Sequence, residues 1–142
     1  MISITPPAYE IITQDAVKSF PDECCGFLYG REDRDRIITD ALVVNNSKDG
    51  DKRRRFEISA KDYLQAERYA EKNGLQLLGV YHSHPNHPAI PSEHDRVAAQ
   101  PYFSYIIISV HDDNIDHIRS WRLNEAFQFE EEPVKQLNYL TI

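Results

Sequence analysis

The mainly apolar run at residues 75–82 (LQLLGVYH) leads directly into a segment crowded with histidines. A short apolar run of this kind predicts a buried strand. Four of the six histidines lie at its end or in the segment that follows, which Asp95 closes; the four are His82, His84, His87 and His94. A chain with this segment has to bring imidazoles to the tip of a core strand, which restricts both its fold and its chemistry.

The rest of the chain predicts helices and strands in mixed order. Three helices are expected, from Tyr9 to Phe20 just before Pro21, from Ser59 to Gly74, and from Ser92 to a point before Pro101. Strands are expected at residues 2–4 (as an edge strand), 24–30, 36–44, 75–82, 105–110, 115–123 and 126–131, with a polar loop at 45–57. This order predicts an α/β domain in which helices pack around one mixed sheet.

The composition narrows the function classes. The chain has 142 residues, 41% hydrophobic and 27% charged, so one globular domain over residues 1–142 is expected. Its formal net charge of −7 argues against nucleic-acid binding, and no apolar run or leader-like segment suggests a membrane span or secretion. The adjacent Cys24 and Cys25 make no disulfide framework, so small buried thiols and a reducing, cytoplasmic setting are expected.

His82 and His84 have the spacing of two ligands on one strand. Side chains at i and i+2 point to the same face of an extended chain, so both imidazoles can approach one ion. A catalytic zinc commonly has three protein ligands and keeps a fourth position for water. Asp95 can be the third ligand, because side chains in the first turn of a helix that starts at Ser92 lean back toward its N-terminus.

Each part of this pattern also has a purely structural interpretation. Ser92 and Asp95 fit a variant of the capping box at a helix start, and the paired histidines could simply be hydrogen-bonded or exposed. His94 would point about 100° away from Asp95 on a helix, so substrate contact or solvent exposure is expected for His94 and for His87. The combination of paired histidines, a proline-rich loop and a carboxylate at the next helix start favours the metal site.

The segment HSHP at residues 82–85, followed after six residues by Ser92 and after two more by Asp95, resembles the JAMM (MPN+) metallopeptidase motif H-[ST]-H-P-x6-S-x2-D. That family also has a glutamate before a glycine-bearing strand, and Glu23 in PDECCGFLYG has this setting. The resemblance implies a cytidine-deaminase-like α/β sandwich of the JAMM/MPN type, with one mixed sheet flanked by helices. It further implies these roles: one Zn²⁺ held by His82, His84 and Asp95, Glu23 as general base, and Ser92 as a stabiliser of the oxyanion.

The resemblance also implies a substrate. JAMM enzymes cleave peptide or isopeptide bonds after the C-terminal Gly-Gly of ubiquitin-like proteins. The chain is similar to the short stand-alone bacterial members, several of which act on sulfur-carrier proteins, so a sulfur carrier with a Gly-Gly tail is the expected partner. Strand addition at a sheet edge beside the zinc would hold the tail. The basic run at residues 52–55 is either a solvated loop or a contact for an acidic surface.

Several other functions stay open. The chain could be a deubiquitinase-like isopeptidase acting on ubiquitin conjugates, or a non-catalytic MPN binding module. A zinc nucleobase deaminase would need H-x-E with P-C-x-x-C, which the sequence lacks. An iron oxygenase with two histidines and one carboxylate uses the same kind of ligands, so analysis of the bound metal would separate it from a zinc peptidase.

Overall fold

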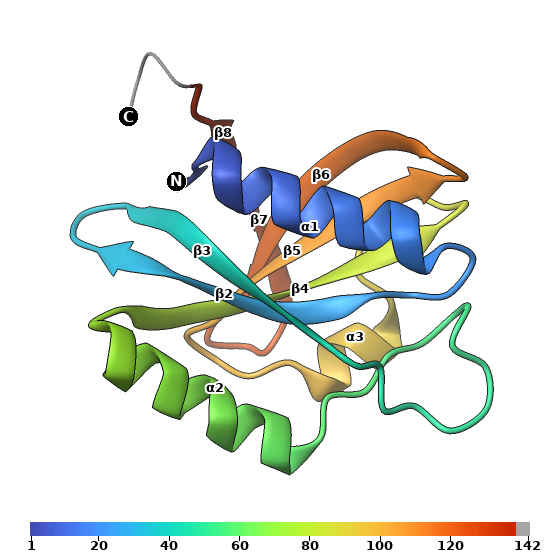
Figure 1. The fold of residues 1–142 in the computed structure, drawn as a ribbon, viewed down its shortest axis with the longest axis horizontal. Coiled ribbons are helices and arrows are strands. Elements are labelled where there is room, and N and C mark those ends of the chain that lie inside the picture. The colour runs from blue at the N-terminus through green and yellow to red at the C-terminus, as the bar shows by residue number, and fades with distance from the viewer. Residues whose placement is uncertain (139–142) are drawn as a thin grey trace.

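Two neighbouring strands with near-continuous apolar sequence, β2 (Cys25–Glu32) and β4 (Gln76–Pro85), form the centre of a mixed sheet (Figure 1). The other strands are β1 (Ile2–Ile4), β3 (Arg36–Val44), β5 (Ser104–His111), β6 (Asn114–Leu123), β7 (Phe129–Glu132) and β8 (Val134–Gln136). The eight strands lie in the order β7-β6-β5-β4-β2-β3-β1-β8. The computed structural model describes residues 1–138, so the last four residues of the expected domain 1–142 lie outside the described part.

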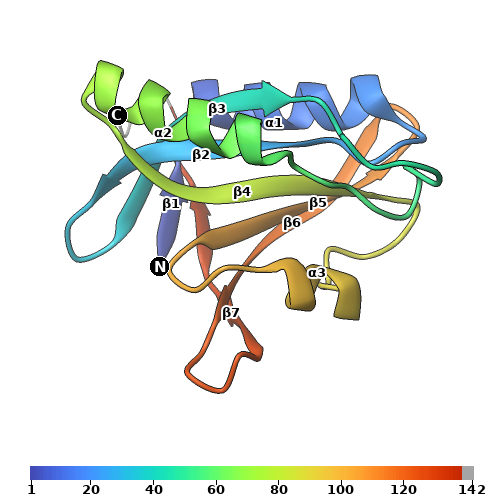
Figure 2. The same ribbon diagram turned by 90° about the horizontal axis from the view of Figure 1, so that it is seen from below.

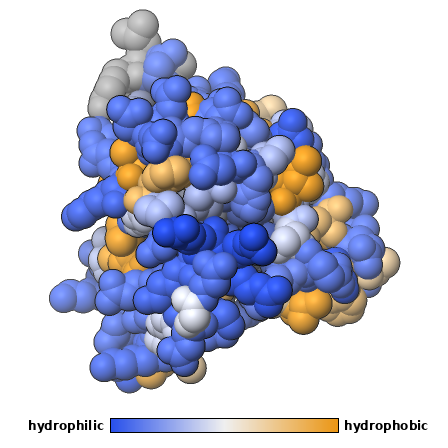
Figure 3. All heavy atoms as spheres, turned by 90° about the vertical axis from the view of Figure 1, so that its right-hand side faces the viewer, coloured by the Kyte–Doolittle hydropathy of each residue, from blue (hydrophilic) through white to orange (hydrophobic). Residues whose placement is uncertain are grey.

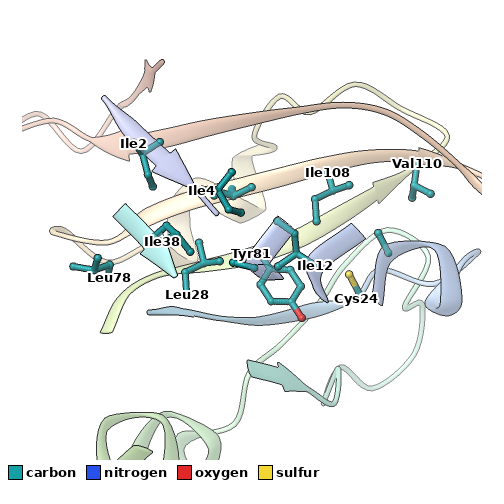
Figure 4. Close-up of a cluster of buried hydrophobic side chains, with 13 residues drawn as sticks. Ile2, Ile4, Ile12, Cys24, Leu28, Ile38, Leu78, Tyr81, Ile108 and Val110 are labelled. Atoms are coloured by element: carbon teal, nitrogen blue, oxygen red, sulfur yellow. The ribbon is translucent and has the colours of Figure 1, made fainter. Parts of the chain in front are cut away.

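Helices cover both faces of the sheet, as Figure 2 shows. They are α1 (Pro6–Ser19), α2 (Ala60–Asn73) and α3 (Glu93–Ala98). Successive strand residues point to opposite faces, which is why Leu28 packs in the cluster beneath α1 whereas Phe27 packs in the cluster beneath α2. Figure 4 shows the α1-side cluster, with Ile12 close to Tyr81. Burial on both faces explains the unbroken apolar runs of the central strands.

The helix boundaries follow the capping residues. Ser59 Oγ accepts a hydrogen bond from the Asp62 N–H at 3.1 Å and starts α2, and Gly74 ends it in the left-handed region at φ 64°. Both features confirm the prediction. Helix α1 begins earlier than predicted, at Pro6, because proline suits the first positions of a helix. In the described part of the chain, no helix has the length and apolarity that crossing a membrane requires.

Two predictions about strands are wrong. β1 is not an edge strand, because it pairs in parallel with β3 on one side and with β8 on the other. Strand β8 was not predicted at all, because its sequence, VKQ, is short and polar. β7 begins at Phe129 rather than at residue 126. The side chain of Asn124 accepts the N–H groups of Ala126 and Gln128 and turns the chain, and Phe127 adopts φ 58°.

Candidate metal centre

β4 carries both histidines of the predicted motif at its C-terminal end. Because the chain is still extended there, His82 and His84 point to the same face, and their Nε2 atoms lie 3.2 Å apart. Asp95, in the first turn of α3, contacts both rings: its Oδ2 lies 3.3 Å from Nε2 of His82 and 3.2 Å from Nε2 of His84. All three side chains are buried. The structure therefore brings together the three residues predicted as ligands.

The orientation of the two imidazoles leaves their Nε2 atoms toward the carboxylate. His84 Nδ1 lies 2.8 Å from the carbonyl oxygen of Pro88, which only accepts, so Nδ1 carries the proton and the Nε2 lone pair is available. The His82 ring stacks on Phe56 with ring centroids 4.4 Å apart. A histidine ligand needs an unprotonated ring nitrogen aimed at the ion, and His84 has this tautomer.

Glu23 lies beside this group, two residues before the start of β2. One of its carboxylate oxygens lies within 4.8 Å of ring nitrogens of His82 and His84, so these three residues form a cluster that could hold a metal ion. Glu23 is 2% exposed, and its Oε1 has no hydrogen-bond partner among residues 1–138. A buried polar atom without a partner is rare, and an oxygen-binding cation or its water ligand would supply one. The donor set of nitrogen and carboxylate atoms fits Zn²⁺.

The charges of the cluster support the same assignment. Burial and the negative charges of Asp95 and Asp51 raise the pKa of Glu23 to about 9. Burial also acts to raise the pKa of Asp95, but the neighbouring His82 and the hydrogen bond from the Ser92 N–H lower it below its usual range. Burial lowers the pKa of His82, against the attraction of Asp95. Of the two carboxylates, Asp95 therefore favours the ionised form more strongly than Glu23 does.

Backbone contacts fix Glu23 in this place. Its N–H donates to the carbonyl oxygen of Lys52 at 2.7 Å, and its own carbonyl accepts from Asn46 Nδ2 at 3.1 Å. The next residue, Cys24, donates its N–H to the buried hydroxyl of Ser83 at 2.8 Å and accepts the Ser83 N–H at 3.2 Å. Ser83 was not predicted to have a role, although its place between the two histidines already put its side chain on the opposite face of the strand.

Ser92 has the structural role that a helix start predicts. Its hydroxyl accepts the Asp95 N–H at 3.0 Å, and Asp95 Oδ2 accepts the Ser92 N–H at 2.9 Å, which completes a capping box. The box also orients the carboxylate of Asp95 toward the histidines. Ser92 is exposed, and its hydroxyl hydrogen is still available to a ligand, so its role as an oxyanion donor stays a prediction.

The other singled-out residues surround the cluster. The exposed His87 ring packs against His84, with centroids 4.2 Å apart, and His94 Nδ1 lies 3.4 Å from a guanidinium nitrogen of Arg55. The structure does not place either ring in the group of Glu23, His82 and His84. Cys24 and Cys25 are buried free thiols, as expected, and burial raises the pKa of both, to about 12 for Cys25.

A pocket of about 210 Å³ opens beside His82 and Asp95, between α2 and α3. Its lining is mainly apolar and includes Phe56, Ile58, Tyr63, Val80, Ala98 and Tyr105. A second, more polar groove of about 560 Å³ lies on the α1 side of Glu23 and is lined by residues of α1 and of the loop after β3. The surface on this side of the molecule is mostly hydrophilic (Figure 3).

The structure has no sheet edge directly beside the candidate ligands in residues 1–138, in contrast to the prediction. The histidines lie on a central strand, and the outer strands are β7 and β8. The nearest strand edge without a pairing partner in residues 1–138 is the second half of β3, because β1 pairs only with Arg36–Ile38. Val44, at the end of that edge, is level with Cys25 and His82 across two strand pairs. The edge is therefore two strands away from the cluster.

Comparison with known proteins gives consistent matches. Residues 5–124 match the model of the family described as prokaryotic homologs of the JAB domain. The chain is 33% identical over 92 residues to a desampylase of Pyrococcus furiosus, a match that spans 65% of the chain and 62% of that protein's length. It is 30% identical over 120 residues to the CysO-cysteine peptidase of Mycobacterium tuberculosis, with 84% of the chain and 80% of the relative covered. The solution structure of a protein from Desulfitobacterium hafniense superposes with a TM-score of 0.85 at 32% identity, covering 97% of this chain and 94% of that one.

Proposed function

The chain belongs to the family of prokaryotic homologs of the JAB domain, and on that basis we propose that it is a zinc peptidase that cleaves after the C-terminal Gly-Gly of a ubiquitin-like protein. The observation that carries the proposal is the convergence of His82, His84 and Asp95 at mutual distances of 3.2–3.3 Å, with the unpartnered Glu23 carboxylate beside them. Membership confirms the resemblance to the JAMM metallopeptidases. The family model matches residues 5–124, and we propose that the metallopeptidase domain spans residues 1–142.

The proposed ligands are Nε2 of His82, Nε2 of His84 and Oδ2 of Asp95. Zinc bound by this set would lower the pKa of a water molecule and polarise the scissile carbonyl. The lowered pKa of His82, the available Nε2 lone pair of His84 and the ionised carboxylate of Asp95 suit a three-ligand site.

The chain's own residues would move the protons. Glu23 accepts a proton from the attacking water and delivers it to the leaving amine, as a base and then an acid. Its buried position and its raised pKa, about 9 before any cation is bound, support a group that can carry that proton. The Ser92 hydroxyl, fixed at the start of α3, donates to the oxygen that becomes negative in the tetrahedral intermediate.

The substrate class rests on the relatives and on the shape of the site. One relative is named a desampylase and another a CysO-cysteine peptidase, and we propose a ubiquitin-like sulfur carrier as the partner here. Two glycines without side chains suit the approach to buried ligands. The mainly apolar pocket beside His82 would take an apolar side chain of the tail, and the loop at 45–57 would contact the body of the partner.

The free thiols of Cys24 and Cys25 support a cytoplasmic location.

The test is a cleavage assay that reads product masses. The purified protein is mixed with tail-extended sulfur carriers and with ubiquitin conjugates, with and without a chelator. We expect chelator-sensitive cleavage after Gly-Gly of the carriers, lost in His82→Ala and retained in His111→Ala, which changes an exposed histidine at the end of β5. Cleavage of ubiquitin conjugates alone would assign a deubiquitinase-like activity instead. Zinc binding without any cleavage would favour a binding module.

A further inference from the structure

Three side chains at the same level of three adjacent strands lie under the loop that follows β4. His84 of β4 is level with Ser109 of β5, and Ser109 is level with His117 of β6. The neighbours of these residues, Ile108 and Ile118, pack in the cluster on the α1 side, so the three side chains share the other face of the sheet. His84 is one of the proposed metal ligands, whereas Ser109 and His117 have no part in the proposed reaction.

Each member of this row binds one of three consecutive loop residues. Ser109 Oγ donates to the carbonyl oxygen of His87 at 2.7 Å. His84 Nδ1 donates to the carbonyl oxygen of Pro88 at 2.8 Å. His117 Nε2 accepts the N–H of Ala89 at 3.0 Å. The loop backbone at 87–89 is thus held at three successive points by three strands.

The contacts of His117 define its tautomer. A backbone N–H can only donate, so Nε2 of His117 is unprotonated and its Nδ1–H faces the Asp116 carboxylate at 2.8 Å. Ala89 is fully buried, and its carbonyl oxygen accepts from Trp121 Nε1 at 3.0 Å. β6 therefore holds both the donor and the acceptor of Ala89, which fixes the Pro88–Ala89 peptide from its far side.

We propose that Ser109 and His117 are positioning residues for His84. They hold the loop so that the Pro88 carbonyl faces Nδ1 of His84, which keeps the proton on Nδ1 and leaves Nε2 free for the metal. The inference rests on the proposed metal site but not on any substrate. A partner of the non-ligating ring nitrogen usually changes metal affinity about 10–100-fold when it is lost. Because Ser109 and His117 act through the loop, we expect the low end of this range.

The test compares His117→Leu, which removes the acceptor, with His117→Gln, whose Oε1 can accept the Ala89 N–H instead. Ser109→Ala removes the second contact. Arg119→Leu is the matched control on β6, since the ion pair of Arg119 is with Glu131 and not with the loop. Nitrogen-15 NMR of the metal-free proteins reports the tautomer of His84, and competition with a chelator reports the affinity for Zn²⁺.

We expect His117→Leu and Ser109→Ala to lose the single Nδ1–H tautomer of His84 and to bind Zn²⁺ about tenfold more weakly. His117→Gln and Arg119→Leu should behave as wild type. The inference is overturned if His117→Leu and Ser109→Ala both keep the wild-type tautomer of His84 and the wild-type affinity for Zn²⁺. It is also overturned if His117→Gln is as impaired as His117→Leu. If His117→Leu does not fold, Ser109→Ala carries the test. If neither the wild type nor any variant binds zinc, the proposed function fails. The His84 tautomer, measured by NMR in the metal-free proteins, then still tests the positioning role of Ser109 and His117.

Discussion

Glu23 carries a buried oxygen that has no hydrogen-bond partner among the described residues. Desolvating such a group costs about 1–3 kcal/mol, so an arrangement of this kind is expected where function requires it. The carboxylate also lies within 4.8 Å of the histidine nitrogens, close enough to share an ion with them, which leaves two chemical roles for it: a fourth ligand or a base. Asp95 is better suited than Glu23 to be the carboxylate ligand, because its pKa is lowered and its Oδ2 contacts both imidazole rings. The role of base therefore falls to Glu23.

Replacing Glu23 with Gln separates these roles. The amide keeps the shape but cannot accept the proton of water, so we expect kcat to fall by about 10²–10⁴ while zinc affinity stays near wild type. The assay is cleavage of a tail-extended carrier, together with a chelator competition for zinc. A parallel loss of zinc in Glu23→Gln would make the residue a ligand, and wild-type turnover would exclude it as the base.

Ser92 should show two separable effects when changed to Ala. Loss of an oxyanion donor is expected to lower kcat by about 10²–10³, and loss of the N-cap of α3 to lower stability by about 1 kcal/mol. Ser59→Ala is the matched control, because Ser59 caps α2 in the same way and is not a member of the metal cluster. Equal turnover in the two variants would reduce Ser92 to a capping residue.

The central strands depend on close backbone approach as much as on apolar side chains. A Cβ built on Gly79 of β4 would lie 2.0 Å from the carbonyl oxygen of Ser104 on β5, and one on Gly26 of β2 would lie 2.3 Å from that of Leu42 on β3. These glycines let β5 approach β4 and β3 approach β2 closely, and β4 carries His82 and His84 at its end.

Gly79→Ala is therefore expected to destabilise the protein by about 1–3 kcal/mol, because the strands would have to separate or bend to admit the methyl group. Denaturant unfolding of the metal-free protein measures this change. Gly50→Ala, in the loop at 45–57, is the comparison: no described residue lies within 4 Å of its Cβ, so only the positive φ of +88° is strained, at a cost of about 1–2 kcal/mol. A loss at Gly79 no larger than at Gly50 would show that the sheet tolerates the methyl group.

Local patterns predicted the elements that depend on local residues. The caps of α2 and α3 and the strand that ends in the paired histidines were visible because their signals lie within a few residues. β8 and the interior position of β1 were not, since they arise from pairing between Ile2–Ile4 and Val134–Gln136, at opposite ends of the chain. The approach of Glu23 to within 4.8 Å of the histidine nitrogens is likewise long-range, and only the family resemblance pointed to it.

The charge of the molecule is uneven around the site. The net charge is −7, yet the exposed run of Lys52, Arg53, Arg54 and Arg55 lies beside the cluster, where the Lys52 carbonyl binds the Glu23 N–H and the Arg55 guanidinium approaches His94. An acidic partner surface would be attracted to this run, and salt would weaken that attraction.

If the run steers the partner, Arg53→Glu combined with Arg54→Glu should lower kcat/KM for a carrier protein and reduce its salt dependence. A short Gly-Gly peptide, which lacks the partner's surface, should be cleaved as by wild type. Arg34→Glu, at the turn between β2 and β3 at the other end of the sheet, is the matched control. Equal effects on carrier and peptide would contradict a docking role.

The most direct test of the metal centre is anomalous diffraction at the zinc edge from crystals of the zinc-loaded protein. The account predicts one zinc peak about 2.0–2.2 Å from His82 Nε2, His84 Nε2 and an Asp95 oxygen, with Glu23 outside the coordination shell. A peak elsewhere in the molecule, or one bound by Glu23 while Asp95 stays out of reach, would contradict it.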